Sequence, residues 1–182
     1  PYPGRREPKS ILAESLDGFD RKLFYPAVQS LLQNEDSVVR ASVRKVFNEL
    51  TDRDLVELLP AITKAIERLA PSNEMFGDGI RLAGLDLLSR LHIREGMPLC
   101  VSVIEVNRWG AGKRIPKCLE CLVRYGVHAK ALLPQLREMR RNLGKQDGSA
   151  ELFDKTIAAI ESSTAKPTVV SLAEFKASPT AK

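Results

Sequence analysis

Apolar residues recur along this chain at the spacing of an amphipathic helix. In one segment they stand three or four positions apart: Leu55, Leu58, Leu59, Ile62, Ile66 and Leu69. Such spacing places them on one side of a helix, where they can face a core. Similar patterns occupy residues 39–50, 80–91, 115–125 and 152–160. The pattern predicts an all-α chain in which every helix buries one face.

A proline recurs at the same place in four apolar segments. The four are Pro26, Pro60, Pro98 and Pro134, which stand 34, 38 and 36 residues apart. A period of this size in a helical chain predicts stacked helix pairs. We expect each proline in the first helix of a pair. At Pro60 we expect a kink or a separate first turn, because proline lacks a backbone N–H. The predicted fold is an α-α superhelix, or solenoid, of about four antiparallel helix pairs.

The repeat pattern covers residues 20–162, and the two ends of the chain lack it. Residues 1–19 are rich in proline and charge, so we expect an extended or loosely ordered segment, and 163–182 are expected to form a flexible tail. The chain begins at Pro1 without a methionine, so we expect a piece of a longer protein. Its compartment and oligomeric state stay open. No apolar run reaches the roughly 18 residues of a membrane span, so we expect no membrane insertion.

The first pair resembles the HEAT-repeat family of armadillo-like helical repeats. The resemblance rests on Asn34-Glu35-Asp36 in the turn, followed by Val38-Val39-Arg40 and Ala41 at the start of the second helix. In that family the turn aspartate and the arginine stabilise the stack, which implies the same role for Asp36 and Arg40. The period here is shorter than the roughly 40 to 47 residues of the class. Tetratricopeptide repeats have a closer period, but their Trp, Leu-Gly and Tyr positions are missing. The resemblance implies a non-catalytic protein-interaction scaffold.

Basic residues are concentrated in one stretch, between residues 108 and 145. They are Arg108, Lys113, Arg114, Lys117, Arg124, Lys130, Arg137, Arg140, Arg141 and Lys145, against Glu120 and Glu138. The stretch therefore carries a charge of +8, whereas the whole chain carries +5. This asymmetry points to an anionic partner near the C-terminal half, and nucleic acid is one candidate because Trp109 could stack on a base.

An aromatic residue followed by Gly-x-Gly and an arginine occurs in two equivalent turns, 33 residues apart. The two motifs are Phe76-Gly77-Asp78-Gly79-Ile80-Arg81 and Trp109-Gly110-Ala111-Gly112-Lys113-Arg114. Open amide groups at a helix start favour an anion, so these turns could hold a small anionic ligand, as a binder or an enzyme would. The alternative is that they only shape the turn. A phosphate loop is not expected, because its lysine-serine or lysine-threonine ending is missing.

The candidate partner-binding residues lie near the starts of the second helices, which line the concave face in a solenoid of this class. They are Arg40, Arg44, Phe76, Arg81, Trp109, Lys113, Arg114 and Lys117. For Arg40 and Arg81 the alternative is an ion pair with Asp36 or Asp78 inside their own turns. The expected partner is a protein or another domain of the parent chain.

No pattern predicts catalytic chemistry, a metal or a cofactor. Cys118 and Cys121 form a Cys-x-x-Cys pair in mid-helix, where buried core cysteines are expected instead of a redox or zinc site. His92 and His128 each lie six residues before a repeat proline, which favours a structural role at a helix start. Neither histidine accompanies a serine or cysteine nucleophile pattern. We therefore expect no catalytic residue, no metal ligand and no cofactor.

Overall fold

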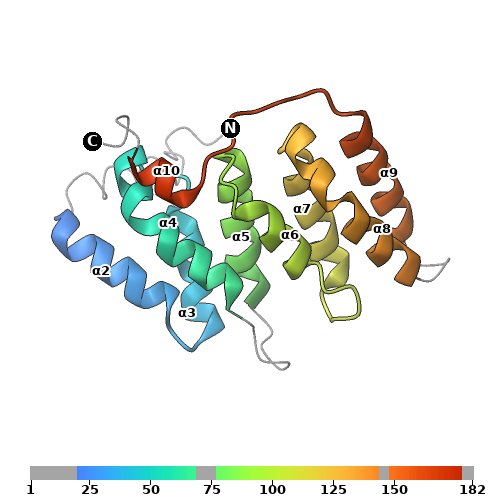
Figure 1. Ribbon diagram of the computed structural model, residues 1–182. Coiled ribbons are helices and arrows are strands. Elements are labelled where there is room, and N and C mark those ends of the chain that lie inside the picture. Colours follow the sequence, from blue (N-terminus) through green and yellow to red (C-terminus); the bar gives the residue numbers. More distant parts are fainter. Residues whose placement is uncertain (1–19, 69–76, 144–147, 178–182) are drawn as a thin grey trace, which may run out of the picture.

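The computed structural model describes residues 20–68, 77–143 and 148–177 of the 182-residue chain. Within these ranges the helices form four consecutive pairs in a row (Figure 1). The first pair is α2 (Arg21–Leu32) and α3 (Ser37–Ser42), and α3 continues into the 3-10 turn η1 (Val43–Val46). The second pair is α4 (Asp52–Glu67) and α5 (Gly77–Arg90). The third pair is α6 (Gly96–Val103) and α7 (Ala111–Val123).

The fourth pair is α8 (Leu133–Asn142) and α9 (Ser149–Ser162), with the 3-10 segment η2 (Gly126–Leu132) before α8. A short helix, α10 (Leu172–Ala177), follows. The described residues contain no strand, only one isolated bridge between Ile93 and Val170. The predicted fold class, an all-α solenoid-like stack of helix pairs, is thus confirmed.

The pairs pack in two layers. The second helices α3, α5, α7 and α9 contact one another in sequence and form one layer, while the first helices form the other. The apolar faces predicted from the sequence meet between the layers, where Leu58, Ile62 and Ile66 of α4 are fully buried. Facing residues such as Ile80 and Leu88 of α5 are equally buried, so one aliphatic core runs through the stack.

The repeat prolines lie on exposed positions of the first helices. Pro26 and Pro60 stand inside α2 and α4, and both helices continue across them without a break. Pro98 stands in the first turn of α6, where a backbone N–H has no intrahelical partner in any case. Pro134 opens α8, after the separate segment η2. The separate first turn expected at Pro60 does not occur, because α4 runs on through this residue.

Residues 163–177 run back along the stack from α9 toward α4 (Figure 1). The Val127 N–H donates to the Ala165 carbonyl at 2.8 Å. At the next pair the Arg94 N–H donates to the Val170 carbonyl, also at 2.8 Å. The segment then places α10 against α4 of the second pair. It therefore connects the fourth, third and second pairs.

This return segment differs from the flexible tail expected over 163–182. It is held by backbone hydrogen bonds and by Val170, Leu172 and Phe175, which pack against the core. The repeat pattern of the sequence does not extend into this segment, so it does not predict the packing. Gly126 allows the close approach, because a Cβ at this residue would lie 2.1 Å from the Ala165 carbonyl oxygen. Gly126 also has a φ of 56°, which disfavours a side chain there.

Candidate functional site

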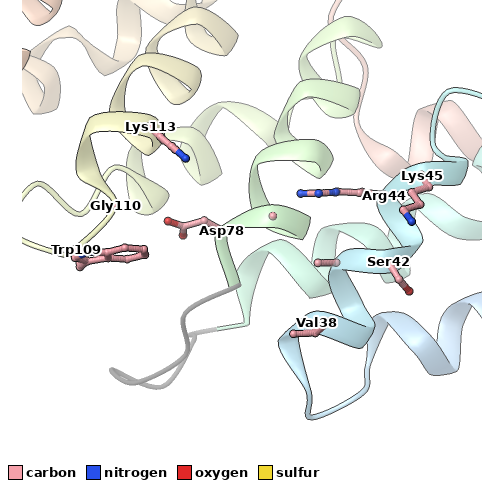
Figure 2. A pocket seen from close by; sticks show the side chains of 10 residues that line it. Val38, Ser42, Arg44, Lys45, Asp78, Trp109, Gly110 and Lys113 are labelled. Carbon is pink, nitrogen blue, oxygen red and sulfur yellow. The ribbon is translucent and has the colours of Figure 1, made fainter.

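A cleft of about 590 Å³ crosses the starts of three second helices, α3, α5 and α7 (Figure 2). Its principal walls are Val38, Arg44 and Lys45 of the first pair, Asp78 of the second, and Trp109 and Lys113 of the third. The stacking of consecutive pairs therefore builds the cleft, since no single pair supplies all of its walls.

Trp109 stands at the rim of the cleft with 78% of its surface exposed. The next residue, Gly110, has a φ of 86° and forms the N-cap of α7. This left-handed backbone turns the chain sharply into the helix, which a residue with a Cβ would do at a cost. The turn leaves the indole outside the core. The second glycine of this motif, Gly112, has no atoms within 4 Å of a Cβ position, so no close contact requires it.

Three cations line the cleft: Arg44, Lys45 and Lys113. All three side chains are exposed, and none has an ion pair or a side-chain hydrogen bond to any residue that the structure describes. Arg44 extends from η1 toward α5, and Lys113 extends from α7 into the same cleft (Figure 2). A Cβ at Gly79 would lie 3.0 Å from Arg44 Nη1. The cleft therefore concentrates positive charge that the described part of the chain does not neutralise.

Arg114 is adjacent to Lys113 in the sequence but has no exposed surface. Its Nη1 donates to Asp78 Oδ2 at 2.7 Å, and its Nη2 donates to the Glu105 carbonyl at 2.8 Å. Its Nε donates to the Ile104 carbonyl at 3.1 Å, and further bonds reach the carbonyls of Arg108 and Trp109. The guanidinium thus holds the loop between α6 and α7 and ties it to α5.

Arg81 and Arg40 occupy similar buried places at the starts of α5 and α3. Arg81 Nη1 donates to Glu105 Oε2 at 3.1 Å and lies 3.8 Å from Asp78 Oδ1. Arg40 Nη1 donates to the carbonyls of Asn34 at 2.6 Å and Glu35 at 2.8 Å. Each arginine satisfies backbone or carboxylate groups that a turn would otherwise leave without donors.

Glu105 connects Arg81 with Arg108, since its carboxylate accepts hydrogen bonds from both. Burial would raise the pKa of its carboxyl, but hydrogen bonds and charge from Arg81 and Arg108 hold that pKa below its ordinary value. Its backbone has a φ of 39°, an uncommon value for a residue with a Cβ. The carboxylate is therefore fixed in the ionised form at neutral pH, between a buried and a half-buried arginine.

These contacts correct part of the sequence-based assignment. Arg40, Arg81 and Arg114 were expected on a partner-binding surface, but they are buried and bonded to turn groups, so a partner has no access to them. The alternative considered for Arg81, a pair with Asp78 in its own turn, agrees with the structure. Asp36 caps α3 by accepting the Val38 N–H at 2.7 Å.

The remaining candidates divide between the cleft and other places. Arg44, Trp109 and Lys113 come together in the cleft. Lys117 lies outside its walls, and its Nζ is 2.8 Å from Asp86 and 3.2 Å from Glu120. Phe76 lies outside the described residues. Lys45 and Val38 were missed, because an exposed lysine and an exposed valine in a helical segment carry no pattern that separates them from ordinary surface.

The basic stretch is largely neutralised by acids from neighbouring helices. Of its nine described basic residues, six form ion pairs: Arg108, Arg114, Lys117, Arg124, Arg137 and Arg140. Burial would raise the pKa of Asp86, but hydrogen bonds from Lys117 and Arg124 hold it below its ordinary value. The local excess of +8 counted along the sequence is therefore much smaller on the folded surface.

The cysteines and histidines take structural places. Cys100, Cys118 and Cys121 are fully buried, as expected, and burial raises the pKa of the Cys118 thiol to about 12. His92 lies in the turn after α5 with a φ of 51°, and His128 Nε2 lies 3.0 Å from the Pro167 carbonyl of the return segment. Among the described helices, none has the length and apolar character of a membrane span.

Comparison of the chain with protein-family models, with curated proteins and with solved structures finds no match in any of the three.

Proposed function

We propose that this chain is a non-catalytic protein-interaction scaffold of the HEAT class, and that partners dock at the cleft across α3, α5 and α7. The observation that carries the proposal is the exposed Trp109 in a cleft built by three consecutive pairs, together with cations that pair with no described residue. The HEAT assignment draws support from the four stacked pairs and from the arginines that secure the turns.

An exposed tryptophan beside arginine and lysine is typical of an interface anchor. Tryptophan and arginine are enriched among the residues that dominate binding energy. Covering most of an indole contributes about 3 to 5 kcal/mol before the costs of association. Val38, with 53% exposure, adds apolar surface on the α3 side of the same cleft and enlarges the area that a partner could cover. These features support docking of another protein.

The hydroxyl and carboxylate groups of the cleft, on Ser42 and Asp78, already take part in structural contacts. Ser42 Oγ donates to the Val39 carbonyl at 2.7 Å, within its own helix. Asp78 Oδ2 accepts from Arg114. A general base or nucleophile needs a free side chain within reach of a substrate. The engagement of these two residues therefore favours binding over chemistry.

Nucleic acid is the weaker candidate. Non-specific binding draws on many phosphate contacts by unpaired Lys and Arg side chains. Within residues 108–143 only Lys113, Lys130 and Arg141 have no ion pair to described residues. Such a sparse set supports a short anionic contact better than a track along a nucleic-acid strand.

Site-specific photo-crosslinking tests the proposal. A photoreactive phenylalanine analogue replaces Val38 in the cleft and, as a matched exposed control outside the cleft, Lys130 of η2. In extract of the source organism we expect a discrete, nuclease-resistant protein adduct from position 38 that position 130 lacks, and that Trp109→Ala removes. Equal adducts from both positions, no protein adduct from position 38, or loss of the adduct with nuclease would contradict the proposal.

A further inference from the structure

The cleft carries a surplus of positive charge that its own acid cannot balance. Asp78 is the acidic residue of its walls, and that carboxylate is bonded to the buried Arg114 and lies near Arg81. Arg44, Lys45 and Lys113 therefore face the cleft without a counter-charge from the described residues. Charged side chains gathered at an interface favour a partner of the opposite sign and steer its approach.

The apolar part of the cleft adds a second requirement. The Trp109 indole and the Val38 side chain are exposed next to the cations. A partner that only supplied negative charge would leave this apolar surface in contact with water. The best complement therefore alternates acidic with apolar groups.

The length of the cleft indicates how much of a partner fits. Neighbouring packed helices lie about 8 to 10 Å apart, so a path from α3 past α5 to α7 spans roughly 18 Å. An extended chain rises about 3.3 Å per residue, so about six residues cover this path. Its alternate side chains point the same way, which brings every second residue to the cleft.

We propose that the cleft binds a short, extended acidic segment of a protein partner. Carboxylates of the segment pair with Arg44 and Lys113, and an apolar side chain between or beside them covers Trp109. Lys45 adds to the attraction at the α3 end. This inference rests on the proposed function, since it names the partner chemistry of the same site.

A nucleic-acid strand fits these observations less well. Each strand of a DNA duplex carries one phosphate per about 3.4 Å of helix axis, so roughly five or six phosphates of one strand would line the same path. Three cations would leave several of those charges unbalanced. Nearby basic residues offer no extension, because Lys117 and Arg124 are paired with Asp86 and Glu120.

Selection from a random octapeptide library displayed on phage tests the inference. The whole chain is the bait, and the double variant Arg44→Gln, Lys113→Gln and the control Lys130→Gln are selected in parallel. We expect enrichment of peptides with at least two acidic residues and an apolar residue, retained by Lys130→Gln and lost in the double variant. Enrichment of peptides without acidic residues, enrichment that survives in the double variant, or no enrichment would overturn the inference.

Fluorescence of Trp109, the only tryptophan, gives the affinity. A synthetic, tryptophan-free copy of a selected peptide should shift the emission saturably, and a copy with Gln for every Glu or Asp should bind at least tenfold more weakly. An oligothymidylate of eight nucleotides that binds more tightly than the acidic peptide would instead favour nucleic acid.

The two proposals fail separately. Suppose that position 38 gives a specific protein adduct but the selected peptides lack acidic residues. This result contradicts only the inference of an acidic segment. Loss of the specific adduct at position 38 removes the docking site itself.

Discussion

Two sets of basic residues come from the same layer of second helices, yet they have opposite surroundings. The first set, Arg40, Arg81 and Arg114, is buried and bonded to turn carbonyls and acids. The second set, Arg44, Lys45 and Lys113, is exposed and lines the cleft. The difference depends on what lies opposite each side chain: a folded loop for the first set, open space for the second. Residue type and sequence neighbourhood do not separate a stabilising arginine from a binding one.

The largest effect is expected from Arg114→Ala. Removing one partner of a buried ion pair costs about 3 to 5 kcal/mol, and here several loop carbonyls lose their donor as well. Lys113→Ala, one residue away, should change the free energy of unfolding by about 0.5 kcal/mol or less, as exposed substitutions do. Urea denaturation of both variants measures this directly. Similar losses for the two would remove the distinction between the sets.

Glu105→Gln addresses the carboxylate that the buried arginines share. We expect a loss of about 2 kcal/mol at neutral pH, because hydrogen bonds between charged groups are replaced by neutral ones. Since folding lowers the pKa of Glu105, its stabilising contribution is present above the unfolded pKa of about 4.3 and is lost as the pH falls through the folded pKa. Denaturation curves of wild type and variant should therefore converge in acid. A constant gap down to acidic pH would show that the charge of Glu105 is not involved.

The glycines of the Trp109 turn should differ from each other. Gly110→Ala places a Cβ on a backbone with a φ of 86° and should cost about 1 to 2 kcal/mol. Gly112→Ala adds a methyl group in open space inside a helix and should stabilise by about 0.5 to 1 kcal/mol. Thermal unfolding of both variants compares them. If Gly112→Ala also destabilised, the second glycine would have a role beyond the geometry of the turn.

The smallest effect on folding is expected from the cleft cations together. Replacing Arg44, Lys45 and Lys113 with Gln should change the free energy of unfolding by about 0.5 kcal/mol or less, because none of them has a partner among the described residues. Binding of an acidic peptide should fall at least tenfold in the same protein, by Trp109 fluorescence. A strongly destabilised triple variant would assign these cations to the fold.

The sequence predicts the stack well, because helical periodicity and the spacing of Pro26, Pro60, Pro98 and Pro134 are properties of short segments. It predicts the cleft only in part. The candidate partner-binding residues include Arg44, Trp109 and Lys113, which line the cleft, but also Arg114, which is buried. The burial of Arg114 depends on Asp78, which is 36 residues away, and on a loop whose conformation includes the positive φ of Glu105. No local pattern encodes either of these. The return segment was missed for a related reason, since its backbone hydrogen bonds and the packing of Val170, Leu172 and Phe175 join it to residues far away in the sequence.

The return segment also changes how the stack can come apart. In a plain solenoid each repeat touches only its neighbours, so folding behaves as a row of coupled units that open from either end. Here the segment after the fourth pair bonds to the third pair and reaches α4 of the second pair. These contacts make the stability of the second, third and fourth pairs depend on one another. The fourth pair then cannot detach while the segment holds. Instead of fraying from its C-terminal end, the array from the second to the fourth pair is expected to melt as one cooperative unit.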